Sequence, residues 1–156
     1  MPVNLDPSAF VADPELIDGL EGQSTGICCV EETVLFRQGD PPSGIYILKS
    51  GSVTLTMTSP ANSEALSLGA RPGSLLGLPA VIGEAPYTLT AVAHPGAHLS
   101  YVPRETFAHI MGHDRALALK ILRVLAAEVR TARTAILEQG PSAAPRRSRL
   151  TPSRQA

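Results

Sequence analysis

The chain has 156 residues, of which 44% are hydrophobic and 17% charged, so it can build one hydrophobic core but not two full domains. Its 13 basic residues nearly balance 14 acidic ones, which argues against nucleic-acid binding over the whole surface. The charge is uneven, because residues 1–140 carry 9 basic and 14 acidic residues, a net charge of −5. The end of the chain has no acid and four arginines, Arg146, Arg147, Arg149 and Arg154. We interpret 140–156 as a disordered basic tail; the alternative is a nucleic-acid-binding arm.

The cysteine pattern and the apolar runs indicate an intracellular protein. Cys28 and Cys29 are adjacent, which is a poor geometry for a mutual disulfide and offers no framework of separated pairs. We therefore expect a cytoplasmic location. The N-terminus has no basic residue before an apolar run, and no apolar segment reaches the ~18–20 residues that span a bilayer. The sequence thus predicts neither a targeting segment nor a membrane anchor.

Residues 1–25 are predicted to form a helical leader. The stretch 7–21 has the composition of one short amphipathic helix or of two helical turns. Asp13 is a suitable N-cap for it, and Pro14 falls in the first turn, where proline is tolerated.

The texture changes over residues 26–103 to short runs of alternating or β-branched residues between clusters of Gly, Pro, Ser and Asp. Many short strands at close spacing are typical of an all-β sandwich or barrel. The segment 53–58 alternates most cleanly and predicts a strand with one buried face. The predicted strands are 26–30, 33–37, 44–49, 52–58, 64–68, 87–94 and 98–102.

Helical periodicity follows over residues 104–139. A short helix is predicted over 104–111, and Asp114 can cap a long helix over 114–138 that Gly140-Pro141 would end. The long helix carries a heptad seam, Ala118, Leu122, Leu125, Val129, Ala132 and Ile136. Leu117, Ile121 and Val124 lie on a neighbouring face. We expect this second face to cover the β core and the seam to meet a partner helix; the alternative is that one monomer buries both.

The segment 72–93 is the most informative part of the chain. Gly77 begins an apolar turn that is too short for an ordinary helix and too apolar for a loop. A short helix held inside a β-barrel presents free backbone N–H groups at its start, and these groups together with the helix dipole attract an anion. The segment therefore predicts a pocket with phosphate-type chemistry.

Three stretches, 33–40, 43–55 and 72–80, carry a resemblance to a known family. Five glycines of these stretches fall in register with the flanking apolar runs: Gly39, Gly44, Gly51, Gly73 and Gly77. Several of the five are expected to have φ > 0. Over about residues 10–138 the chain resembles the cyclic-nucleotide-binding domain of the Crp/Fnr transcription regulators. The resemblance implies a mainly β fold with flanking helices, a double-stranded β-roll (jelly-roll) over 26–103. It also implies a phosphate cassette over 72–93 and a long C-terminal dimerisation helix.

The cassette departs from the family pattern at two positions. Nucleotide-binding members carry a Glu after the cassette glycine and an Arg near the end of the cassette, where this chain has Leu78 and Tyr87. A phosphate without its guanidinium loses a bidentate, charge-assisted pair, so we expect no cAMP binding in the family manner. Thr88 matches the small hydroxyl position of the family. The candidate pocket residues are Gly77, Leu78, Pro79, Ala80, Tyr87 and Thr88.

Other features of the chain do not favour a reactive site. For the candidate pocket of the cassette, an equally open alternative is that it holds no ligand, because Leu78, Val81 and Ile82 fill it as part of the hydrophobic core. His109 and His113 are spaced as a helical metal site would be, but no complete ligand set accompanies them, so we interpret them as surface histidines. Strand alternation predicts one inward and one outward cysteine. We find no catalytic motif, and we predict a non-enzyme without metal or cofactor.

Only about eighteen residues follow the long helix, too few for the helix-turn-helix domain that family regulators carry there. The sequence thus predicts a Crp/Fnr-like ligand-sensing and dimerisation module, a homodimer without a DNA-binding domain. Its effector would be a small molecule other than cAMP, or ligand binding has been lost. Two alternatives stay open: a partner that forms DNA-incompetent heterodimers with a full-length regulator, and a ligand-free structural dimer module.

Overall fold

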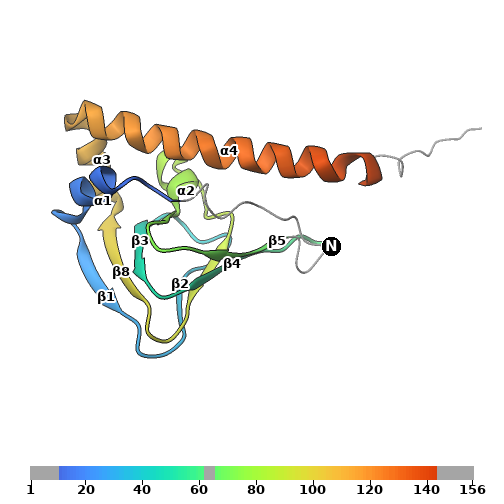
Figure 1. Cartoon of the computed structure of the whole chain (residues 1–156), viewed down its shortest axis with the longest axis horizontal. Coiled ribbons are helices and arrows are strands. Elements are labelled where there is room, and N and C mark those ends of the chain that lie inside the picture. The colour runs from blue at the N-terminus through green and yellow to red at the C-terminus, as the bar shows by residue number, and fades with distance from the viewer. Residues whose placement is uncertain (1–10, 62–65, 144–156) are drawn as a thin grey trace, which may run out of the picture.

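The computed structural model of the chain describes residues 11–61 and 66–143, without the side chains of 132 and 134–143 (Figure 1). Parts of the predicted leader (1–25) and basic tail (140–156) therefore lie outside the described residues. The helices are α1 (Pro14–Glu21), α2 (Leu78–Gly83), α3 (Arg104–His113) and α4 (Arg115–Ala143). The strands are β1 (Thr25–Cys28), β2 (Thr33–Phe36), β3 (Gly44–Ser50), β4 (Val53–Met57), β5 (Leu66–Ala70), β6 (Leu75–Leu76), β7 (Thr90–Ala93) and β8 (His98–Pro103).

The strands form two four-stranded antiparallel sheets, ordered β1-β8-β3-β6 and β2-β7-β4-β5. The predicted mainly β jelly-roll with flanking helices is confirmed, and each of the seven predicted strands overlaps a strand of the structure. β6 was not predicted, because two residues cannot display a periodicity. The predicted strand 87–94 is shorter in the structure, where β7 begins at Thr90 and leaves Tyr87 outside the ladder.

The sheet β1-β8-β3-β6 separates two hydrophobic cores, and its strands β3, β6 and β8 place buried side chains in both of them. β3 illustrates the division: Leu48 belongs to the core between the two sheets, whereas Ile45 and Ile47 belong to the core shared with the helices. Successive side chains of a strand point to opposite faces, so one strand supplies both cores. We call these the roll core and the helical core.

Local capping explains where the helices begin. Asp13 Oδ1 accepts a hydrogen bond from the Leu16 backbone N–H at 2.8 Å, and Asp114 Oδ1 accepts one from the Leu117 N–H at 3.0 Å. Both predicted caps are thus confirmed. The predicted end of the long helix at 138 is wrong, because α4 continues through Gly140-Pro141 to Ala143. A proline inside a helix removes one N–H donor and crowds the preceding turn, so Gly140-Pro141 disfavours the helix here but does not end it.

Helix α4 runs along the top of the molecule, over α1, α3 and α2 (Figure 1). Lys120 of α4 reaches α1, where its Nζ lies 3.2 Å from Asp13 Oδ2. The hydrogen bond from Leu16 and the contact with Lys120 both lower the pKa of Asp13. A Cβ added to Gly19 would lie 2.9 Å from Leu117 Cδ1, so α1 and α4 approach closely at this glycine. Within the described ranges, no helix is long and apolar enough to cross a membrane.

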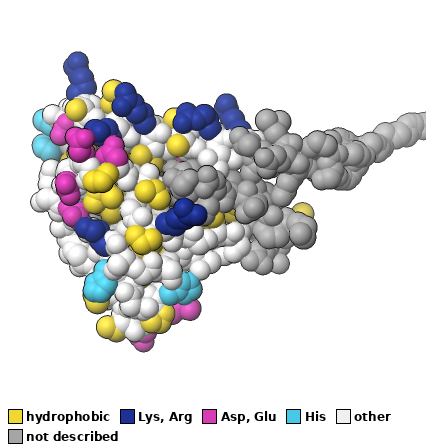
Figure 2. All heavy atoms as spheres, viewed as in Figure 1, with side chains coloured by type: hydrophobic (Ala, Val, Ile, Leu, Met, Phe, Trp, Pro, Cys, Tyr) yellow, Lys and Arg dark blue, Asp and Glu magenta, His cyan; other side chains and the backbone are white. Residues whose placement is uncertain are grey.

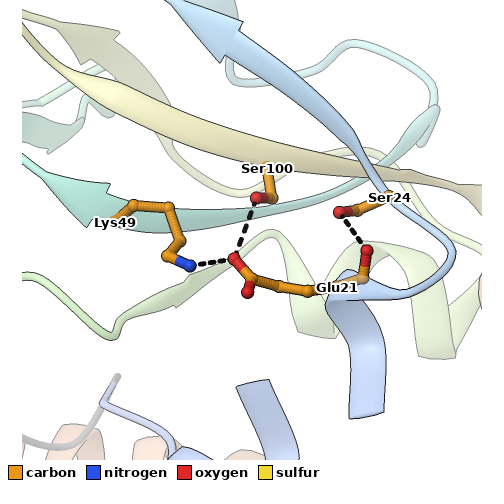
Figure 3. A network of polar contacts seen from close by, with 4 residues as sticks. All are labelled: Glu21, Ser24, Lys49 and Ser100. Carbon is orange, nitrogen blue, oxygen red and sulfur yellow. Dashed lines mark hydrogen bonds and ion pairs between the residues drawn. The ribbon is translucent and has the colours of Figure 1, made fainter. Parts of the chain in front are cut away.

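The other end of α1 is tied to the roll through Glu21 (Figure 3). Its carboxylate pairs with Lys49 of β3, and its Oε2 accepts a hydrogen bond from Ser100 Oγ of β8 at 3.3 Å. The Glu21 backbone carbonyl accepts a hydrogen bond from Ser24 Oγ at 2.9 Å. The Lys49 and Glu21 side chains are 38% and 29% exposed, so solvent weakens the ion pair.

We predict that apolar burial holds α1 in place more strongly than this ion pair does. Leu20 is fully buried in the helical core, so Leu20→Ala should lower the free energy of unfolding by about 2–5 kcal/mol. Glu21→Gln should cost only about 0–1 kcal/mol. Urea unfolding followed by circular dichroism measures both variants, and a larger loss for Glu21→Gln would contradict the prediction.

Candidate functional site

The predicted cassette centres on Gly77, the N-cap of α2, which has φ of +96°. This left-handed conformation favours glycine, and the neighbours demand it too. A Cβ at position 77 would lie 3.0 Å from Tyr87 Cε1 and 3.3 Å from the carbonyl oxygen of Gly44. Positive φ was expected at several of the five glycines that carry the resemblance, and Gly39, Gly51, Gly73 and Gly77 have it. Gly44 does not, and a Cβ there would instead collide with the Val102 carbonyl oxygen at 2.3 Å.

The six predicted pocket residues do not line one space. Leu78 is fully buried in the helical core, on the far side of the sheet from the roll interior. Ala80 and Tyr87 are buried in the roll core. Pro79 and Thr88 are exposed to solvent. Position 78 therefore faces α4 and the other helices, and Tyr87 is the large side chain that the cassette directs into the roll.

The hydroxyl of Tyr87 is held by the loop that precedes β3. It accepts hydrogen bonds from the backbone N–H groups of Ser43 at 3.1 Å and Gly44 at 3.2 Å, and it donates to the Gly44 carbonyl oxygen at 2.7 Å. A phenol has one donor and two acceptor positions, so all its hydrogen-bonding capacity is used. Tyr87 is only 3% exposed, which makes these bonds costly to break.

Backbone contacts and an aromatic stack reinforce this arrangement. The Tyr87 N–H donates to the Asp40 carbonyl at 2.9 Å, and the Gly39 N–H donates to the Tyr87 carbonyl at 2.8 Å. The Tyr87 ring stacks on Phe36, with centroids 3.9 Å apart and an interplanar angle of 13°. Residue 87 is thus joined to the 39–44 loop by main chain and side chain together, while its ring lies over Gly77. We call this set of contacts the Tyr87 lock.

Two further tyrosines extend the aromatic cluster along the sheet. Tyr46 and Tyr101 are paired across β3 and β8, with ring centroids 4.9 Å apart, and Tyr46 lies 6.0 Å from Phe36. Burial, with smaller contributions from Tyr101 and Tyr87, raises the pKa of Tyr46 to about 12. Its hydroxyl therefore stays protonated at physiological pH and donates to the Leu35 carbonyl at 3.3 Å.

A groove of about 640 Å³ lies on the other side of α2, between α2 and α3. Val81, Ile82, Phe107 and Met111 supply its apolar surface. Glu84, which ends α2 with φ of +50°, lies on its edge together with Arg104 and Glu105. Sequence reasoning missed this groove, because its walls come from segments more than twenty residues apart that show no shared motif.

The predicted seam of α4 is partly visible to solvent. Leu122 is 44% exposed and Val129 is 42% exposed, which is unusual for large apolar side chains on a core-covering helix. Ala118 and Leu125 are half-buried, and Leu125 also packs against the helical core. The side chains of Ala132 and Ile136 lie outside the described residues.

Glu128 was not singled out from the sequence, yet only 8% of this residue is exposed to solvent. Neither of its carboxylate oxygens has a hydrogen-bond partner among the residues that the structure describes. Burial raises its pKa to about 8, so the carboxyl group is mostly protonated at pH 7 in the single chain.

The histidines and cysteines form no larger cluster. His109 and His113 stack on each other, with ring centroids 4.0 Å apart, on the exposed surface of α3. In the described part of the chain, no group of three or more His, Cys, Asp or Glu side chains is arranged to hold a metal ion. Cys28 is exposed and Cys29 is buried, so the predicted alternation of the two thiols is confirmed.

We predict that the Tyr87 hydroxyl contributes measurably to stability. Tyr87→Phe should lower the free energy of unfolding by about 1–3 kcal/mol, because it leaves the buried Gly44 N–H and the partly buried Ser43 N–H without this partner. Tyr101→Phe is the matched control: its hydroxyl also donates to this loop, at the Ser43 carbonyl, but in an exposed setting. Urea unfolding compares the two, and equal losses would argue against the lock.

Comparison with known proteins places this fold in a family. The model of the cyclic nucleotide-binding domain matches residues 27–114, more than half of the chain. No curated protein matches the sequence. Among solved structures, the chain is similar to the catabolite activator protein of Thermus thermophilus, with 26% identity and a TM-score of 0.68. That match covers 88% of this chain and 63% of the other.

Two isolated domains of transcriptional regulators are also similar in fold. One is the N-terminal domain of a transcriptional regulator from Streptomyces coelicolor, with 24% identity, a TM-score of 0.60, and coverage of 81% of this chain and 91% of that one. The other is the sensor domain of the regulator DNR from Pseudomonas aeruginosa, with 18% identity, a TM-score of 0.58, and coverage of 89% and 87%. The chain spans 56%, 63% and 58% of the first three solved chains that it matches. The matched segment holds the β-roll and its cassette, and the chain belongs to the cyclic nucleotide-binding domain family.

Proposed function

We propose that this chain is a sensor and dimerisation module of the Crp/Fnr type that does not bind cAMP in the manner of its family. The observation that carries the proposal is the Tyr87 lock. The family resemblance puts the phosphate-binding arginine at position 87, and here a buried, fully hydrogen-bonded tyrosine takes that position. Domains of this family are regulatory and typically non-enzymatic, and we propose a binding role for this chain as well.

The charges around the cassette support this proposal. Neither the 39–44 loop nor the segment 77–90 contains a Lys, Arg or His, whereas each contains one acidic residue, Asp40 and Glu84 respectively. A buried phosphate needs cationic or N–H donors to offset its lost hydration. The Ser43 and Gly44 N–H groups, which could serve, already donate to the Tyr87 hydroxyl. Leu78, at the position of the ribose-binding glutamate, is buried in the helical core.

An effector of this module therefore has to differ from a cyclic nucleotide. To enter the roll it must displace the Tyr87 ring from Phe36, and the aromatic cluster that it would then meet favours an uncharged, planar or apolar molecule. Such a ligand would act by stabilising the displaced state of Tyr87 relative to the locked one.

We expect isothermal titration calorimetry to detect no binding of cAMP to the wild-type chain at ligand concentrations up to about 100 µM. Tyr87→Arg should gain cAMP binding, because it restores a guanidinium at the cassette end and frees the two N–H groups. Tyr87→Gln is the control that frees the same groups without adding a charge. Micromolar binding of cAMP by the wild-type chain would refute the proposal.

Dimerisation is proposed to occur through α4. The exposed Leu122 and Val129 alternate with the half-buried Ala118 and Leu125 at heptad spacing, as in the seam of a two-helix coiled coil. A monomer would leave Leu122 and Val129 in water, whereas a second copy of the same helix would bury them. A parallel arrangement matches the two seams residue for residue and places both rolls on the same end.

Leu122→Glu should weaken the dimer by about 100-fold or more, because it forces a carboxylate into the seam of both copies. Ala116→Glu adds the same charge at an exposed position away from the seam and should leave the dimer intact. Sedimentation equilibrium measures both dissociation constants. If Leu122→Glu dimerises as tightly as Ala116→Glu does, α4 is not the interface.

A further inference from the structure

Glu128 is the buried polar group that the fold of a single chain leaves unexplained. It follows Leu117, Ile121 and Val124 on one face of α4, at spacings of four, three and four residues. These three side chains belong to the helical core or pack against it. The next position on this face is the carboxyl group of Glu128, whose two oxygens have no partner among the described residues.

A buried carboxyl group without hydrogen bonds is rare in native proteins, because it loses its hydration and gains nothing in return. Burial raises the pKa of Glu128 towards neutrality in the single chain. A partner with N–H donors would restore the lost interactions and favour the ionised form. A basic group that the proposed dimer brings next to Glu128 would supply such donors.

The heptad positions of α4 identify that group. With Leu122 and Val129 at the a positions and Ala118 and Leu125 at the d positions, Glu128 is a g position, beside the seam. In a parallel two-stranded coiled coil, a g side chain lies next to the e side chain five residues later on the partner helix. Five residues after Glu128 is Arg133, which is an e position and is exposed.

Arg133 is available for this contact. It takes part in no ion pair or hydrogen bond among the described residues. The other g and e positions between 115 and 131 are Leu119, Ile121 and Ala126, which carry no charge. Among the e and g positions from 115 to 133, Glu128 and Arg133 of the partner subunit are therefore the one opposite-charge pair that the in-register seam brings together. The symmetry of the dimer forms this pair twice.

The charge of the described part of α4 also favours this pair. Lys and Arg side chains line the edge of the molecule along which α4 runs (Figure 2). The basic residues of α4 are Arg115, Lys120, Arg123, Arg130 and Arg133, and Glu128 is the one acidic residue among its described side chains. Two such helices repel each other in parallel unless an acidic group beside the seam opposes the repulsion.

We propose that Glu128 pairs with Arg133 of the partner subunit in a parallel α4 dimer, and that this pair sets the register and orientation of the two helices. The inference rests on the dimerisation proposed above and names the residues that specify it. A shift by one heptad places Glu128 opposite Ala126 or beyond Arg133, and an antiparallel arrangement separates the two charges. The pair therefore selects a second copy of this chain, because a partner helix needs both an acid at g and a base at the following e position.

A double-mutant cycle tests the pair. The variants are Glu128→Gln, Arg133→Gln and the two together, with Arg130→Gln as the matched control, which removes the same charge from an exposed position on the outer side of α4. Sedimentation equilibrium gives the dimer dissociation constant, and circular dichroism verifies the fold. We expect Arg133→Gln to weaken the wild-type dimer about 10-fold more than Arg130→Gln does, and to lose this excess when residue 128 is Gln.

Arg133→Glu provides a second test of the pair and leaves the buried Glu128 unchanged. It brings two acids together and should weaken the dimer more than Arg133→Gln does. If Arg133→Gln and Arg130→Gln weaken an intact dimer equally, the pair is refuted while the α4 dimer stands. If the wild-type chain is monomeric at all concentrations, the proposed dimer fails and the pair fails with it.

Discussion

The hydrogen bonds of one phenolic hydroxyl, that of Tyr87, hold together the segments around the cassette of this β-roll. Tyr87 uses its donor and both acceptor positions on the backbone of Ser43 and Gly44, and its ring stacks on Phe36 and contacts Gly77. The loop before β3, the start of α2 and the segment before β7 are thereby joined at one point. The family resemblance puts the phosphate-binding arginine at position 87, whereas the tyrosine at that position here uses its hydroxyl for hydrogen bonds within the protein itself.

The position of α2 links this lock to the dimerisation helix. Ala80 belongs to the roll core, whereas Leu78 and Val81 belong to the helical core together with Leu117 and Ile121 of α4. Because both cores are closely packed, a shift of α2 on one side is felt on the other. An effector that displaced Tyr87 would release the segment that begins at Gly77 and change the packing beneath α4. Through α2, the two cores form one contiguous packed path from the roll to α4.

Much of the fold could be predicted from the sequence because the relevant signals are local. The caps at Asp13 and Asp114, the alternation in β4 and the glycines with φ > 0 each depend on a few neighbouring residues. That Tyr87 stands at the end of the cassette, where the family carries an arginine, could be predicted from the resemblance. Its role could not, because the lock depends on N–H groups more than forty residues away. The burial of Glu128 was hidden for a similar reason, since helical spacing places it beside the core but cannot say whether a partner meets it there.

We propose that Tyr87 occupies the Ser43 and Gly44 N–H groups and thereby closes them to a nucleotide phosphate. Amide hydrogen exchange, followed by NMR with and without saturating cAMP, observes these two groups directly. The account predicts slow exchange at both amides in the free protein, no change on adding cAMP, and much faster exchange in Tyr87→Phe. Fast exchange at Ser43 and Gly44 in the wild-type protein, or protection that appears only with cAMP, would contradict it.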